Sequence, residues 1–468
     1  MARGLVGCPL AATVVTLINS TVGIAALSIP FCFYQCGVIL SLLIILITAV
    51  SCVASCDLLI GLFSHLKGSS FETACLRYLS GTGKIACEIS IIGLMVGSIV
   101  NFNVGVADFG WDVASMMMFG TRRYLLRAVI MGLVTVAITP LCLIFKIHRL
   151  SRFNAFAMPF YSLLVIHMAI FLGGPNLRRS LPYMTWWKPS GLARCLPIFF
   201  GSLFCQTQLH SIYLSLCEPS VAAMRTVVRF TVAVIAVSYA LFGFLGYAAF
   251  AQFEEFRGNV FIMYPMDAAS LMVQVGFLLS VTFSMPLVFF PLRESLNGLL
   301  WHRGDCSSFD VKLNTEPFIP IRRFRIMTVS TLIICCLLSL TTDKVEVTLE
   351  LTSSLAASLS GFILPALVSL SAFGVVETYK ERTIACYLLF VGVLLFCLGV
   401  YPLIGNSEST MNVLAVSAQL VNQSQDTMSH LRHESVESLG VDAIKFLNGV
   451  NGSRKLSQVS GRANNGSL

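Results

Sequence analysis

Residues 19–30 read NSTVGIAALSIP and lie inside an apolar run, residues 11–34, that is long enough to cross a bilayer. A helix that faces only lipid has no need of a polar side chain such as that of Asn19. Gly23 permits unusual backbone angles and Pro30 removes a backbone donor, so this run predicts a helix that breaks within the membrane. Backbone groups freed there must be satisfied by protein, water or a ligand, which makes the break a candidate ligand site. The alternative is a tight helix contact through small residues.

The composition indicates an integral membrane protein. Of the 468 residues, 56% are hydrophobic and 12% are charged, whereas about 25% are charged in a typical soluble domain. The net charge of +8 is spread over loops, so no nucleic-acid partner is expected and the lipid bilayer is the first partner. Eleven apolar runs are predicted to span it, at residues 11–34, 37–63, 85–108, 124–145, 153–173, 192–216, 226–250, 268–293, 325–341, 347–371 and 383–404.

The loops between these runs predict the orientation. With the N-terminus in the cytosol, inner loops hold about twice as many Lys and Arg residues as outer loops, which is the expected bias. An odd number of spans then places residues 406–468 outside the cell or in a lumen, at the plasma membrane or an endomembrane. This segment is rich in Ser and Asn and is predicted to be disordered. It holds three Asn-x-Ser sequons, at Asn422, Asn451 and Asn465, which are candidate glycosylation sites.

The sixth run shares the polar character of the first. It carries Cys205, Gln206 and Thr207 where lipid would favour Leu. The two interrupted runs are five spans apart, and because five is odd, the second set of five enters the membrane in the opposite orientation. Secondary transporters use this inverted-repeat plan, with a site where the broken helices meet. The expected organisation is a transporter domain of residues 1–405, with repeats over about residues 11–173 and 192–371 and an extra span at residues 383–404.

The eighth run carries Ser280, Thr282 and Ser284 just before Pro286. Hydroxyl oxygens, together with carbonyls of a broken helix, are ligands suited to a dehydrated hard cation. The alternative is that these hydroxyls bond to carbonyls of their own helix, as often happens beside a proline kink.

The sixteen cysteines lie mostly within apolar runs. Cys52 and Cys56 are one helical turn apart beside Asp57, but no His or second Cys pair completes a metal site. These cysteines are therefore interpreted as small hydrophobic residues, with no metal expected beyond a transported ion. The sequence shows no nucleophile–base pair and no GxGxxG, P-loop or zinc-protease motif, so no enzymatic activity and no organic cofactor are predicted.

Four segments in combination resemble the sodium-coupled neutral amino acid transporters of the amino acid/auxin permease superfamily, over about residues 5–405. They are TLINSTVGIAALSIPFCFYQCG (residues 16–37), RCLPIFFGSLFCQTQ (194–208), SLCEPS (215–220) and FFPLRESL (289–296). The resemblance implies an all-α fold of eleven spans, arranged as a five-plus-five inverted repeat with spans one and six broken, as in LeuT-like transporters. It also implies alternating access and movement of neutral amino acids coupled to a cation, with sodium as the expected coupling ion.

The resemblance further implies roles for individual residues. Asn19 matches the family's cation-ligating asparagine and Ser284 matches its hydroxyl in the eighth span, so the candidate cation site comprises Asn19, Ser280, Thr282 and Ser284. Thr21, Gly23 and Ile24 match the unwound segment whose amides receive the substrate carboxylate. With the break of the sixth span, the candidate substrate site comprises Thr21, Gly23, Ile24, Cys205, Gln206 and Thr207.

Two alternatives remain open at this stage. The protein could be an amino acid sensor that binds without appreciable flux and signals through the long cytosolic loop at residues 297–325. Coupling to protons instead of sodium is the other alternative, because His167 or His210 could titrate.

Overall fold

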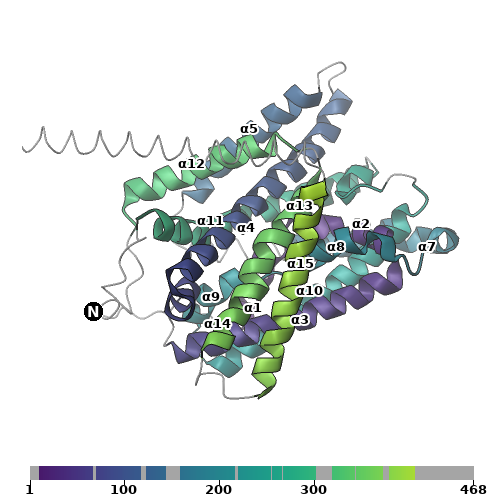
Figure 1. The fold of residues 1–468 in the computed structure, drawn as a ribbon. Helices are drawn as coiled ribbons and strands as arrows, with labels where there is room; N and C mark the ends of the chain where they lie inside the picture. Colours follow the sequence, from purple (N-terminus) through teal and green to yellow (C-terminus); the bar gives the residue numbers. More distant parts are fainter. Residues whose placement is uncertain are drawn as a thin grey trace, which may run out of the picture. The chain divides into compact units, whose positions relative to one another are not determined.

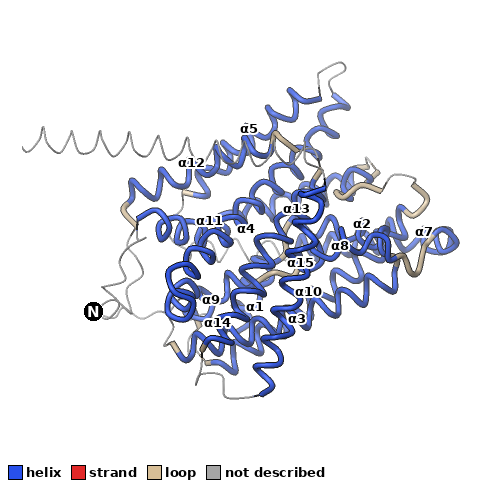
Figure 2. Tube along the Cα trace, in the orientation of Figure 1, coloured by secondary structure: helices blue, strands red, loops and turns tan. Residues whose placement is uncertain are grey.

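The computed structural model describes residues 10–66, 70–117, 123–143, 159–216, 220–253, 256–265, 267–301, 319–342, 344–372 and 379–405. These described residues are almost entirely helical and contain no β-strand (Figure 2), which confirms the prediction of an all-α protein. The candidate glycosylation sites Asn422, Asn451 and Asn465 lie outside the described residues.

Seven helices in the described part of the chain are long and apolar enough to cross a membrane, or eight if the bent first span counts as one. The seven are Val38–His65 (α3), Phe71–Trp111 (within α4), Pro159–Tyr183, Val221–Phe250 (α10), Ala268–Trp301 (α11), Val345–Ser371 and Tyr379–Tyr401 (within α15). Helices also occupy three further predicted runs, as α5 (Arg123–Cys142), α8 with α9 (Leu192–Ser202 and Leu209–Ser215) and α12 (Ile321–Ser339). The protein is thus multi-pass, while the count of eleven spans stays a prediction.

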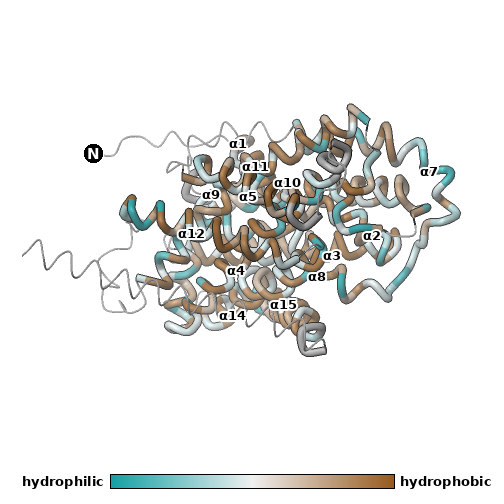
Figure 3. The backbone as a smooth tube through the Cα atoms, turned by 90° about the horizontal axis from the view of Figure 1, so that it is seen from above, coloured by the Kyte–Doolittle hydropathy of each residue, from teal (hydrophilic) through white to brown (hydrophobic). Residues whose placement is uncertain are grey.

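The outer faces of these helices are apolar, as a lipid environment requires. On α3 the exposed side chains recur at helical spacing and include Leu46, which is 61% exposed. Exposed apolar side chains also lie on α5 and α11, where Val136 is 71% and Met272 is 74% exposed. Apolar surface on this scale is rare on soluble monomers. Figure 3 shows the corresponding hydrophobic colouring along most helices.

The first span breaks where the sequence predicts. Helix α1 (Leu10–Thr21) ends, a 3-10 turn follows (η1, Ile24–Ser28), and α2 (Ile29–Cys36) continues at 59° to α1. Pro30 stands in the first turn of α2, where its missing N–H costs no helical hydrogen bond. Gly23 has φ −139° and ψ −160°, an extended conformation open to any residue. Neither backbone strain nor packing against neighbours therefore requires glycine here, since an added Cβ would meet no atom within 4 Å.

The sixth span is also interrupted. Helix α8 ends at Ser202, residues 203–205 are not helical, and a 3-10 turn (η5, Gln206–Gln208) leads into α9. Both predicted breaks are therefore present.

Several other irregularities were not predicted. Helix α4 (Phe71–Met117) contains a break at Ser80, whose φ is 66°. The fifth span contains a π-helical turn (η2, Met168–Gly173) followed by α7 (Gly174–Ser180). The tenth span runs from α13 (Val345–Thr352) through two π-helical turns, η7 (Ser353–Ala357) and η8 (Leu359–Ile363), into α14 (Leu364–Ser371). Such turns are frequent at functional sites.

Three long helices, α4, α10 and α11, contact the first span. Helix α10 packs against α1, α2 and α3, while α11 packs against α4 and also contacts α1. Helices α5 and α12 lie side by side along α4 (Figure 1). The break between α1 and α2 is held among α4, α8, α10 and α11, which places it inside the protein rather than at its lipid-facing surface.

Candidate functional site

A cavity of about 130 Å³ opens at the break of the first span. All seven consecutive residues 19–25 line it. The rest of its wall comes from α4, the sixth span, α11 and the tenth span, including η7. The predicted residues Asn19, Thr21, Gly23, Ile24, Thr207 and Ser284 are all among the lining residues.

One edge of the cavity is a cluster of oxygen atoms. Asn19 Oδ1 accepts hydrogen bonds from Ser284 Oγ at 2.8 Å and from the Tyr161 hydroxyl at 3.1 Å. The Tyr161 hydroxyl also lies 3.2 Å from the Val22 carbonyl oxygen, and Ser284 Oγ lies 3.0 Å from the Ser280 carbonyl oxygen. Asn19 and Ser280 are each 1% exposed. Side-chain and carbonyl oxygens gathered in this way are the donor set that a hard cation requires.

The break provides a second kind of polar group, namely backbone N–H. The first hydrogen bond within η1 runs from Ala26 N to the Gly23 carbonyl at 3.1 Å. The N–H groups of Ile24 and Ala25 therefore precede the bonded part of the turn, as at any helix start. The start of a helix carries partial positive charge and its end carries partial negative charge. Residues 19–25 therefore present to the cavity both the partly negative end of α1 and the partly positive start of η1.

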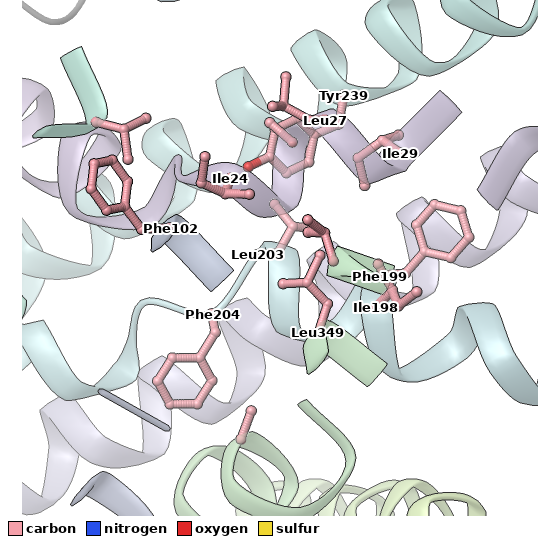
Figure 4. Close-up of a cluster of buried hydrophobic side chains, with 14 of the residues drawn as sticks. Ile24, Leu27, Ile29, Phe102, Ile198, Phe199, Leu203, Phe204, Tyr239 and Leu349 are labelled. Carbon is pink, nitrogen blue, oxygen red and sulfur yellow. The ribbon is translucent and has the colours of Figure 1, made fainter. Parts of the chain in front are cut away.

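Apolar side chains line much of the rest of the cavity. Figure 4 shows Ile24 of the first span together with Phe102, Phe204 and Leu349 from other elements, all four of which line the cavity. Polar residues interrupt this apolar lining, namely Ser98 and Asn101 on α4, Thr207 and Gln208 in the sixth span, and Thr352 and Ser353 in the tenth span. Asn101 lines the cavity and its side-chain oxygen bonds the Thr348 hydroxyl, whereas Asn103 donates to Ser339 Oγ at 3.3 Å, away from the cavity.

Two of the predicted residues in the sixth span lie elsewhere. Gln206 lines a second, smaller cavity of about 30 Å³. Its Oε1 accepts a hydrogen bond from Cys205 N at 2.9 Å. Cys205 Sγ lies 3.5 Å from Cys56 Sγ and 3.8 Å from Cys52 Sγ, on the side of α3. Of the three, Thr207 alone lines the main cavity, and it lines the second cavity as well.

The predicted hydroxyls of the eighth span also differ in position. Thr282 Oγ1 donates to the Leu278 carbonyl at 2.7 Å, so for this residue the back-bonding alternative describes the geometry. Two residues along a helix rotate a side chain by about 200°, which separates Thr282 from the face that carries Ser284. Ser280 joins the oxygen cluster through its carbonyl.

Neither histidine considered for proton coupling is among the residues lining the main cavity. His210 lines the second cavity and its ring lies 5.3 Å from that of Phe63. His167 is buried, 5.3 Å from the ring of Phe171.

Tyr161 is the main contributor to the oxygen cluster that the sequence did not indicate. It stands in an ordinary apolar stretch, and no local signal distinguishes it from a packing residue. Its role becomes visible only in the folded structure, where the fifth span packs against Asn19.

Two broken helices around a buried cavity, with an oxygen cluster at one edge, define a membrane transport protein of the LeuT-like class. The family model described as transmembrane amino acid transporter protein matches residues 10–405, and the chain belongs to this family. A solved structure of a Na⁺-coupled sialic acid symporter, in a substrate-bound outward-open state, aligns with a TM-score of 0.51 at 14% identity, covering 84% of this chain and 88% of that one. This likeness confirms the fold class.

Similar curated proteins point within the family to the sodium-coupled neutral amino acid transporters. Solute carrier family 38 member 10 of Rattus norvegicus is 29% identical over 438 residues, covering 92% of this chain and 38% of that protein. The Homo sapiens protein of the same name is 31% identical over 367 residues, covering 76% and 32%. A Xenopus laevis relative with the provisional name sodium-coupled neutral amino acid transporter 10 is 29% identical over 412 residues, covering 86% and 38%. The chain spans less than two fifths of the length of these relatives.

Proposed function

We propose that the protein moves neutral amino acids across a membrane by alternating access, coupled to sodium. The observation that carries this proposal is the cavity at the break of the first span, with backbone N–H groups on one side and the Asn19–Ser284 oxygen cluster on the other. The family and the names of similar proteins support the same assignment.

The chemistry of the cavity suits a zwitterion. A carboxylate would bind the N–H groups at Ile24 and Ala25, where the helix start is positive. An ammonium group would bind carbonyl oxygens at the end of α1. The side chain would then lie against Phe102, Phe204 and Leu349.

The preference for neutral side chains follows from what lines the cavity. None of its lining residues in the described part of the chain is an Asp, Glu, Lys, Arg or His. A charged substrate side chain would lose its hydration there without gaining a partner, which is costly. Coupling follows if sodium at Asn19 and Ser284 holds the first span in the form that binds substrate, because a ligand shifts an equilibrium only through its different affinities for the two states.

A transport measurement tests this proposal. The purified chain in liposomes, offered a panel of amino acids with and without a sodium gradient, is expected to accumulate neutral ones only when sodium is present outside. Uptake of the same amino acids at equal rates without sodium would contradict sodium coupling. Binding without uptake would favour the sensor alternative, whose proposed loop at residues 297–325 lies largely outside the described residues.

The proposed orientation has a test that requires no substrate. With a cytosolic N-terminus and eleven spans, residues 406–468 lie outside or in a lumen, so we expect glycosylation at Asn422, Asn451 or Asn465 in a eukaryotic secretory pathway. A glycosidase is expected to shift the wild-type band and leave the triple Asn→Gln variant unchanged. Cleavage of this segment by a protease applied from the cytosolic side would contradict the orientation.

A further inference from the structure

Three cysteine thiols meet beside the break of the sixth span. Cys52 and Cys56 lie one turn apart on α3, and Cys205 is the last residue before η5. Cys205 Sγ lies 3.8 Å from Cys52 Sγ and 3.5 Å from Cys56 Sγ, and all three sulfur atoms lie within 4.8 Å of one another. Each residue is at most 1% exposed.

We propose that Cys52, Cys56 and Cys205 form a binding site for a thiophilic closed-shell metal ion, with Zn²⁺ the ion that the distances fit. Zinc–sulfur bonds of about 2.3 Å in tetrahedral geometry place sulfur atoms about 3.8 Å apart. The distances from Cys205 Sγ to the other two sulfur atoms match this value to within a few tenths of an ångström, so three of the four ligand positions are already in place. The sequence supplies two of these ligands one helical turn apart, and folding brings the third from about 150 residues away.

The surroundings suit a metal–thiolate group. The Leu203 carbonyl oxygen lies 3.2 Å from Cys52 Sγ and is available as a fourth ligand. Gln206 Nε2 lies 4.0 Å from Cys52 Sγ, and the Gln206 side chain is held by the hydrogen bond that its Oε1 accepts from Cys205 N. An N–H donor to a ligating sulfur stabilises the thiolate, as outer groups do in other metal sites. Binding releases the thiol protons to solvent, so affinity should rise with pH.

The proposed metal site lies directly beside residues that line the two cavities. Cys205 lies between Phe204, which lines the main cavity, and Gln206, which lines the second one. A metal that joins Cys205 to α3 would fix residues 203–205 against a long, straight helix. Any movement of the sixth span that changes access to the cavity would then be slowed while metal is bound.

Metal content of the whole chain tests the site without reference to transport. Protein purified in detergent with a thiol reductant is loaded with Zn²⁺, passed through a weak chelator, and analysed for zinc per polypeptide. Wild type is expected to retain one more equivalent than each of Cys52→Ser, Cys56→Ser and Cys205→Ser. With Co²⁺ as a spectroscopic probe, wild type is expected to show thiolate-to-cobalt charge-transfer absorption that the three variants lack.

Cys195→Ser is the matched control, because Cys195 is a fully buried thiol of the same broken span outside this cluster. It is expected to retain zinc as wild type does. Zinc is also expected to raise the midpoint of thermal unfolding of wild type and Cys195→Ser but not of Cys205→Ser, which shows that the variant is folded and lacks the site. Equal zinc retention by wild type and Cys205→Ser, or no retention by reduced wild type, would overturn the proposal.

Discussion

The two broken spans contribute to the cavity in different ways. The first span presents seven consecutive residues, 19–25, so its backbone itself forms part of the wall. The sixth span contributes only separate residues, namely Gly201 at the end of α8, Phe204 in the non-helical stretch, and Thr207 and Gln208 in η5. Of its non-helical residues 203–205, Phe204 lines the cavity, whereas Cys205 meets the thiols of α3.

This difference indicates a division of roles. Exposed backbone can bind the carboxylate and ammonium groups that all α-amino acids share, and the oxygen cluster lies at the same break. Side chains such as Phe204 can only shape the pocket around the variable part of a substrate. We therefore expect substitutions in the first span to impair binding of substrate or sodium, and substitutions in the sixth to alter stability or selectivity.

The largest effect is expected for Gly23→Leu. A Cβ atom added at Gly23, which lines the cavity, would meet no atom within 4 Å, and the extended backbone there accepts any residue. Folding should therefore be preserved and sodium-dependent uptake should fall to background. Gly61→Leu is the matched control, since a Cβ atom added at Gly61 on α3 would also meet no atom within 4 Å. If Gly23→Leu took up substrate with wild-type affinity, the break of the first span would not be part of the substrate site.

A smaller but specific effect is expected for Asn19→Ala and Ser284→Ala. Each change removes one oxygen from the cluster. Loss of an outer group that only orients a metal ligand weakens affinity by about 10–100-fold, so loss of a ligand oxygen should cost at least as much. The sodium concentration for half-maximal uptake should rise by about that factor or more. Asn176→Ala is the control, because the Asn176 side chain donates a hydrogen bond to the Leu172 carbonyl and is not among the residues that line the cavity. Unchanged sodium dependence in both cluster variants would refute this assignment of the ion site.

The smallest effect is expected in the sixth span, for Gly201→Ala. An added methyl group would overlap the Ser353 side chain on η7, and overpacking of this kind typically costs about 1–3 kcal/mol. The midpoint of thermal unfolding should fall. Adding Ser353→Gly should recover part of the loss, so that the double variant is more stable than the sum of the single changes predicts. Gly132→Ala, at a position with no atom within 4 Å, should leave stability nearly unchanged.

The sequence predicted the first break well because its signals are local. Gly23, Pro30 and the polar residues around them disrupt an apolar helix wherever it packs, and the structure breaks there. The approach of Asn19 to Ser284 was expected only through resemblance to a family, since the two are 265 positions apart. Gln206 and Cys205 were assigned to the cavity because they share a polar stretch with Thr207, but the direction of each side chain depends on how the chain turns after residue 203.

Contacts between distant spans account for what could not be predicted. Tyr161 reaches Asn19 from the fifth span, and Cys205 reaches α3 across about 150 residues. The π-helical turns η7 and η8 also lack a clear sequence signal, although η7 lines the cavity through Ser353. Each of these features depends on the packing of complete helices rather than on the composition of one.

The most direct test of the account is an experimental structure of the protein with a transported neutral amino acid and sodium at saturating concentrations. The account predicts density for the amino acid at the first-span break, with its carboxylate at the N–H groups of Ile24 and Ala25. It also predicts an ion within coordination distance of Asn19 and Ser284. Substrate density at another location, or an empty cavity under conditions where binding is measured, would contradict it.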